Sequence, residues 1–118
     1  MVMKVNVYIF ENGGFRKLKE LNIGNSSSLC SIIIYKGSLC FLRKLEFWRN
    51  TQLKTVPTGI QHLEKLHVLS IWDMRMLIEF VQSIAPNGGK EHWTIEHVPI
   101  IEFYPAGDKS VRYLRTKN

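Results

Sequence analysis

Apolar side chains recur along this chain at intervals of 24 residues. The pattern LxxLxI first appears at Leu18–Ile23, and two closely similar patterns follow it. Four apolar columns keep the register: Phe15, Leu39 and Leu63; Leu18, Leu42 and Leu66; Leu21, Leu45 and Leu69; and Ile23, Phe47 and Ile71. Successive side chains of a β-strand face opposite sides. Each apolar–polar–apolar triplet therefore predicts a short strand with one buried face, and the columns predict an internal repeat.

The second half of each unit keeps the same register, through Leu29, Leu53 and Leu77 and through Ile32, Val56 and Phe80. Extended backwards, these columns reach Val5 and Tyr8, so residues 1–14 are predicted to be a partial repeat without its strand half. Between the strands, Pro57 and Gly59 favour a turn-rich return segment over a long helix.

A period of 24 lies within the range of roughly 20–29 residues typical of leucine-rich repeats. The predicted fold is an α/β solenoid: a short leucine-rich-repeat horseshoe segment with parallel strands on its concave face and an irregular or short-helical convex side. Residues 15–86 are predicted to hold three repeats. Residues 87–118 are predicted to form a C-terminal cap over the last repeat, with strands at Ile100–Tyr104 and Val111–Leu114 around a turn at Pro105–Asp108.

One turn position carries a polar residue of a typical kind. Asn50 lies where leucine-rich repeats often have an asparagine that hydrogen-bonds the turn backbone. Ser26 and Met74 occupy the equivalent positions, so we expect looser turns in the first and third repeats.

The outward positions of the strands define a candidate binding surface. Trp48 and Trp72 fall in the same column of adjacent strands, and Arg49 and Asp73 follow them in register. Exposed aromatic side chains beside Arg and Asp have the composition of a protein-binding hot spot. The alternative is that the tryptophans pack beneath the C-terminal segment or a neighbouring domain. The candidate protein-binding residues are Trp48, Trp72, Arg49, Asp73, Glu46 and Lys44.

The composition favours a single intracellular domain. The chain has 118 residues and a formal net charge of +6. Its basic residues are spread from Lys4 to Lys117 without a run of like charge, so we expect a solvated surface and no nucleic-acid partner. Cys30 and Cys40 lack CxxC spacing and are expected to be reduced. Without a signal-peptide pattern or a long apolar run, the expected location is the cytoplasm, with no membrane partner.

Patterns for catalysis or metal binding are missing from the sequence. Gly88-Gly89-Lys90 is followed by Glu91 and lacks the earlier glycine of a phosphate-binding loop. The four histidines occur in HxxxxH pairs, a spacing that does not place two imidazoles on one helical face for zinc. A GxSxG nucleophile elbow is also absent. We therefore expect no enzyme activity, no metal and no cofactor.

Four segments resemble one family beyond the repeat itself: GGFRKLKELNIGNSSSL, KGSLCFLRKLEF, QLKTVPTGIQHLEKLHVLSIWDM and NGGKEHWTIEHVPII. From Gly13 to Ile101 they resemble the C-terminal leucine-rich-repeat segment of plant coiled-coil, NB-ARC disease-resistance proteins. VPTGIQHLEKL and HWTIEHVP are the most specific parts. The chain departs from the family at Cys40, where proline is common, and at Lys36, which replaces the apolar column of Ile60 and Ile84.

The resemblance implies a protein-recognition module of plant innate immunity. Its partner would be a pathogen effector, a modified host protein or an NB-ARC domain, which carries the nucleotide switch in that family. This sequence has no P-loop, so nucleotide exchange and signalling are not assigned to it. Two alternatives stay open. One is a truncated, non-signalling fragment that acts as a decoy or self-associates through an open N-terminal repeat edge. The other is a basic nucleic-acid-binding domain.

Overall fold

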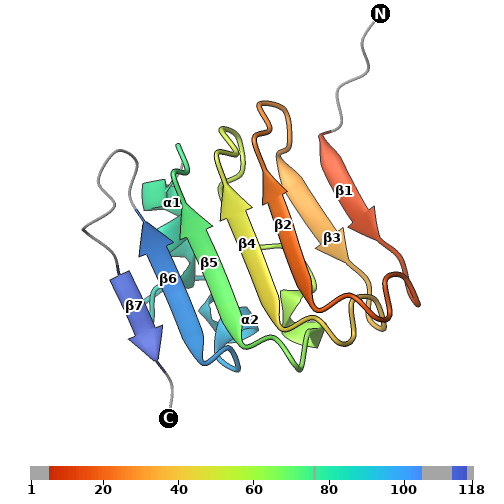
Figure 1. The fold of residues 1–118 in the computed structure, drawn as a ribbon. Helices are drawn as coiled ribbons and strands as arrows, with labels where there is room; N and C mark the ends of the chain where they lie inside the picture. Colours follow the sequence, from red (N-terminus) through yellow and green to blue (C-terminus); the bar gives the residue numbers. More distant parts are fainter. Residues whose placement is uncertain (1–5, 76, 105–112, 117–118) are drawn as a thin grey trace, which may run out of the picture.

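The computed structural model describes residues 6–75, 77–104 and 113–116. Figure 1 shows its strands in a row, with the two α-helices behind the larger sheet. In chain order the elements are β1 (Val7–Phe10), β2 (Glu20–Gly24), β3 (Ser31–Ile34), β4 (Lys44–Trp48), the 3-10 helix η1 (Ile60–His62), β5 (Val68–Trp72), α1 (Leu77–Ile84), α2 (His92–Ile95), β6 (Ile100–Tyr104) and β7 (Tyr113–Thr116).

The larger sheet has the strand order β2-β4-β5-β6-β7. Strands β2, β4, β5 and β6 run parallel, and Glu20 pairs with Lys44, which pairs with Val68. This confirms the parallel strands and the 24-residue register that the apolar columns predict. The apolar pattern and the strand pairing agree here because a slip of one residue would turn a strand's leucines to the opposite face of the sheet.

The C-terminal segment extends this sheet. Ile100 pairs with Val68 in parallel, and β7 then pairs with β6 in the antiparallel direction. The strand at Ile100–Tyr104 is therefore confirmed, whereas the next strand spans Tyr113–Thr116 and so ends two residues beyond the predicted Leu114. Val111 and the turn at Pro105–Asp108 lie outside the described residues.

The return side differs from its prediction. A second, two-stranded sheet forms there, in which β1 pairs with β3 in parallel and Tyr8 faces Ile32, as the column predicts. An irregular or short-helical return is wrong for β3, because three successive isoleucines at 32–34 favour extended backbone. The next unit contains Pro57, which has no N–H to donate, and contributes only the bridge between Ile33 and Thr58 before η1.

The hydrophobic core lies between the larger sheet and the return segments. Leu45, Phe47, Leu69 and Ile71 from the inward strand positions are at most 1% exposed. The same columns continue into β2, the edge strand beside β4 in the larger sheet, where Leu21 is partly buried and Ile23 is buried. Val5 lies outside the described residues, and the side chains of Leu77 and Phe80 are not described.

Phe15 corrects one of the predicted columns. It shares a column with the buried Leu39 and Leu63, but it is 62% exposed. Its unit stands at the outer end of the sheet, where no described strand pairs with the free side of β2. Lys36 is likewise exposed where Ile60 and Ile84 are buried, so the sequence departure there leaves a gap in the apolar column.

Asn50 fixes the turn after β4, as the sequence predicts. It is fully buried, and its Nδ2 donates to the carbonyl oxygens of Ile23 at 2.9 Å and Trp48 at 3.2 Å. In the preceding unit the Ser26 hydroxyl accepts hydrogen bonds from two backbone N–H groups of its own turn, at Ser28 and Leu29. Buried Met74 takes the third equivalent position, and its sulfur accepts from the Asn50 backbone N–H at 3.3 Å.

Within the described residues, no helix combines the length and the apolar character that crossing a membrane requires.

Candidate protein-binding face

The candidate residues lie on the face of the larger sheet opposite its buried side chains, and the two α-helices lie on the other side of this sheet (Figure 1). Alternation along β4 buries Leu45 and Phe47 and turns Lys44, Glu46 and Trp48 outward. The same alternation turns Trp72 outward at the end of β5, and Arg49 and Asp73 follow the two strands. We call the surface formed by Lys44, Glu46, Trp48, Arg49, Trp72 and Asp73, which are the six residues predicted from the sequence, the outward face.

Trp48 and Trp72 form a stacked aromatic pair on this face. Their ring centroids lie 5.5 Å apart and their planes differ by 11°. Direct pairing of these residues in the sheet places the two side chains at adjacent strand positions. Offset stacking of this kind adds to the apolar area that each ring contributes. Both side chains stay partly exposed, so the pair is available at the surface.

Gly24 makes room for Trp48 at the outer end of the column. A Cβ atom at Gly24 would lie 2.1 Å from the Trp48 indole, which shows that the ring extends across the glycine. Tyr104 continues the column on the other side, because it pairs with Trp72. The column therefore runs from Gly24 through two tryptophans to a tyrosine, with the glycine covered by its neighbour's ring.

Arg49 and Asp73 form an ion pair beside the tryptophans, with 2.7 Å between Arg49 Nε and Asp73 Oδ2. Both residues have left-handed backbone, with φ of 49° and 52°, and so does Asn25 one unit earlier. Each of these residues directly follows a strand, at the same repeat position. Because the pair is largely open to solvent, it contributes less than about 1 kcal/mol to stability. Its charged groups remain accessible to a partner.

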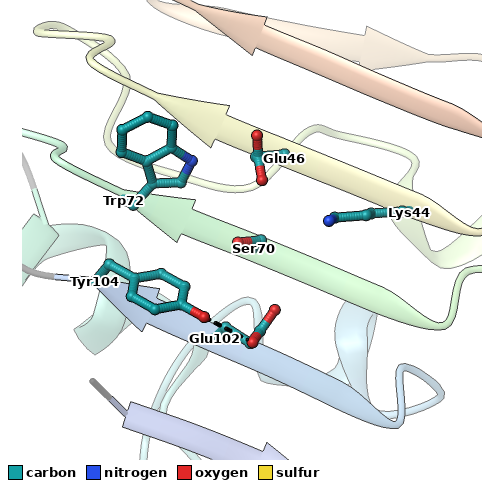
Figure 2. A pocket seen from close by; sticks show the side chains of 6 residues that line it. All are labelled: Lys44, Glu46, Ser70, Trp72, Glu102 and Tyr104. Carbon is teal, nitrogen blue, oxygen red and sulfur yellow. Dashed lines mark hydrogen bonds between the residues drawn. The ribbon is translucent and has the colours of Figure 1, made fainter. Parts of the chain in front are cut away.

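A cavity of about 350 Å³ opens on the outward face over β4, β5 and β6. Its floor is Ser70, which is 2% exposed, and Figure 2 shows the other side chains around it. The Tyr104 hydroxyl donates to Glu102 Oε2 at 2.8 Å. We call this cavity the outward pocket; it is lined by Lys44, Glu46, Ser70, Trp72, Glu102 and Tyr104.

The structure thus brings the six candidates together as a stacked pair, an ion pair and part of a pocket lining. Trp48 lies over Gly24 and does not line the pocket. The sequence pattern predicts the strand that holds Glu102 and Tyr104 but does not mark these two residues as part of the site. Their unit is longer than 24 residues, so the column rule could not assign them to the rows of Ser70 and Trp72.

β6 lies beside β5 and not over it, so it does not cover the tryptophans. The C-terminal segment that could have packed on them forms, in its described part, α2 behind the sheet and the next two strands of the same sheet (Figure 1). The described residues contain no group of three or more His, Cys, Asp or Glu side chains placed to hold a metal ion.

Comparison with known proteins gives consistent matches. The chain is 30% identical over 101 residues to "Probable disease resistance protein RF45" and to "Probable disease resistance protein RDL5" of Arabidopsis thaliana. It is 27% identical over 101 residues to "Disease resistance RPP8-like protein 3" of the same plant. These alignments cover 83% of the chain in the first two cases and 86% in the third.

The chain spans only 9–11% of the length of these relatives. No protein-family model matches the chain, and no solved structure matches it. The agreement of several relatives over most of the chain shows the kinship that its sequence motifs indicate. The chain is homologous to a segment of the plant disease resistance proteins.

Proposed function

We propose that this chain is a leucine-rich-repeat segment that recognises a protein in plant defence through its outward face. In this proposal the parallel strands at 24-residue register are the concave side of a short horseshoe, and β6 and β7 close its end. The relatives are named as disease resistance proteins, which supports a role in defence. The partner is a pathogen effector, a host protein or a nucleotide-binding domain, met in the cytoplasm.

One observation carries this proposal: a stacked pair of partly exposed tryptophans, flanked by an accessible ion pair, on a sheet face that no described element covers. Large aromatic side chains and arginine dominate the binding energy of protein interfaces. The exposed part of the two tryptophan rings is apolar area that a partner's surface would bury. The two α-helices lie on the other side of the sheet (Figure 1), which is the side of the buried strand positions.

The test compares two tryptophans on opposite sides of the sheet. Trp72 lies on the outward face, whereas Trp93 is 60% exposed on α2 behind the sheet. A partner identified by proximity labelling in plant tissue is purified, and its affinity for each variant is measured by interferometry. We expect Trp72→Ala to weaken binding by about tenfold or more, and Trp93→Ala to leave it nearly unchanged. A folded Trp72→Ala variant with wild-type affinity would contradict the proposal.

A second candidate function is self-association at the outer end of the sheets. β1 and β2 are both terminal strands, and Val7, Tyr8 and Ile9 of β1 are exposed. Residues of both strands, together with Ser26 and Leu29, line an open cleft of about 230 Å³. An exposed apolar strand edge is a template for pairing with another chain. We propose a second copy as the occupant of this edge.

Light scattering across a concentration series tests this candidate. We expect the wild-type chain to increase in average mass with concentration, and Ile9→Lys to remain monomeric, because a charge on the edge strand opposes pairing. Trp93→Lys introduces the same charge on α2 and should behave like the wild-type chain. Monomeric wild-type protein at all concentrations would rule the candidate out.

A further inference from the structure

In the outward pocket one glutamate lies on each side of a small serine. Glu46, Ser70 and Glu102 pair directly across β4, β5 and β6. With adjacent strands 4.7–4.9 Å apart, the backbones of the two glutamates are separated by roughly 9–10 Å. The serine leaves the space between them open, and the carboxylates stand on either side of it (Figure 2). This spacing admits one cationic group between two acceptors.

Aromatic rings border one end of the same space. Trp72 and Tyr104 each follow, two residues along their strand, the positions of Ser70 and Glu102. The hydrogen bond from the Tyr104 hydroxyl to Glu102 holds that carboxylate beside the ring. The faces of tryptophan and tyrosine attract cations, most strongly when the cation is planar and weakly hydrated. Carboxylates and aromatic faces therefore favour the same kind of occupant.

Lys44 lies at the other end of the pocket, on the side away from Trp72 and Tyr104 (Figure 2). It precedes Glu46 by two residues on β4, so its ammonium group is on the same face. Its ammonium group repels any cation in the pocket, so the charge of an occupant is favoured at the ring end, farthest from Lys44 (Figure 2). The same ammonium group can donate to a carbonyl oxygen. The pocket is thus polarised, with rings at one end, carboxylates in the middle and a donor at the far end.

We propose that the outward pocket binds the side chain of an arginine on the partner protein. The guanidinium lies against Trp72 and Tyr104 and donates to Glu46 and Glu102, while Lys44 donates to a backbone carbonyl beside that arginine. Arginine fits better than lysine because its planar group offers five donors, enough for two carboxylates, and stacks on aromatic rings. This inference rests on the proposed function and adds the chemistry that the partner must present.

The experiment uses three short peptides and needs no identified partner. The probes are acetyl-Gly-Arg-Gly-amide, its citrulline analogue, which keeps the shape without the charge, and its lysine analogue. Binding to the full chain is measured by NMR titration, with the Trp72 indole N–H as the reporter. We expect the arginine peptide to shift this resonance, and the citrulline and lysine peptides to bind about tenfold more weakly or worse.

Two matched variants locate the binding. Glu46→Gln removes one carboxylate of the pocket and should weaken the arginine peptide by about tenfold. Glu20→Gln makes the same change on β2, at an exposed position outside the pocket, and should have no effect. Thermal melting checks that both variants fold.

The inference is overturned if citrulline binds as well as arginine, or if Glu46→Gln binds the arginine peptide as wild type does. Preference for lysine would also overturn it. These outcomes leave the proposed function testable by itself, because the comparison of Trp72→Ala with Trp93→Ala uses a whole protein partner and does not depend on arginine.

Discussion

Replacing Phe47 with alanine should lower the free energy of unfolding by about 3–5 kcal/mol. Phe47 is fully buried, and it pairs in the sheet with Ile23 on one side and Ile71 on the other. Removing its ring takes contacts from both neighbouring strands and leaves a void that a rigid sheet cannot close. A domain of this size has a stability of only about 5–15 kcal/mol, so the loss is a large part of the total.

Urea unfolding followed by circular dichroism measures this change. Phe41→Ala is the matched control, because Phe41 is 48% exposed and its ring lies under the Lys65 ammonium, 5.4 Å from the ring centroid, outside the buried core. The control should cost less than about 1 kcal/mol. Equal midpoints for the two variants would show that Phe47 does not lie in the core that the sheet and the return segments enclose.

The strands of the larger sheet were predictable because burial repeats in sequence. Leu45 and Leu69 occupy equivalent places in successive units, and the parallel register that buries both of them is the one that the columns define. The stacked tryptophans follow from the same register, since two residues in one column must be neighbours. For these strands, the 24-residue spacing of apolar residues in the sequence is enough to predict which residues pair in the sheet.

The return side was less predictable because the equivalent segment of each unit forms a different secondary-structure element. The isoleucines at 32–34 form a strand, the segment after Pro57 forms a bridge and η1, and the third unit forms α1. The aligned positions Ile32 and Val56 are both buried, so their apolar character gives no sign of this difference. Local backbone preferences decide the element, and they vary under a constant pattern of burial.

Part of the outward pocket was missed for a related reason. Glu102 and Tyr104 belong to the rows of the outward face only because β6 pairs with β5 across a longer unit. A fixed period of 24 cannot place them. A search that allowed one insertion before Ile100 would have aligned Ile101 with Leu69 and Phe103 with Ile71, and would have found both residues.

Replacing Gly59 with alanine should destabilise the chain by more than about 2 kcal/mol, although the added methyl group is small. Gly59 has φ of 97°, in the left-handed region. A Cβ atom there would lie 1.9 Å from the Ile34 carbonyl oxygen, which is a backbone atom and cannot rotate away. The hydrogen bonds Thr58 N–H to Ile32 O and Ile34 N–H to Thr58 O hold the two segments at this distance.

Gly88→Ala separates the two causes of this cost. Gly88 also has positive φ, at 87°, but no atom of the described residues beyond its two chain neighbours lies within 4 Å of the position its Cβ would take. Alanine there should cost only the left-handed strain, about 1–2 kcal/mol. The difference between the two midpoints in urea therefore measures the close approach of the backbones at Gly59, and equal midpoints would contradict that approach. Gly59 lies in VPTGIQHLEKL, one of the segments that carry the family resemblance. A larger cost at Gly59 would mean that the glycine in this segment is required by how neighbouring units pack.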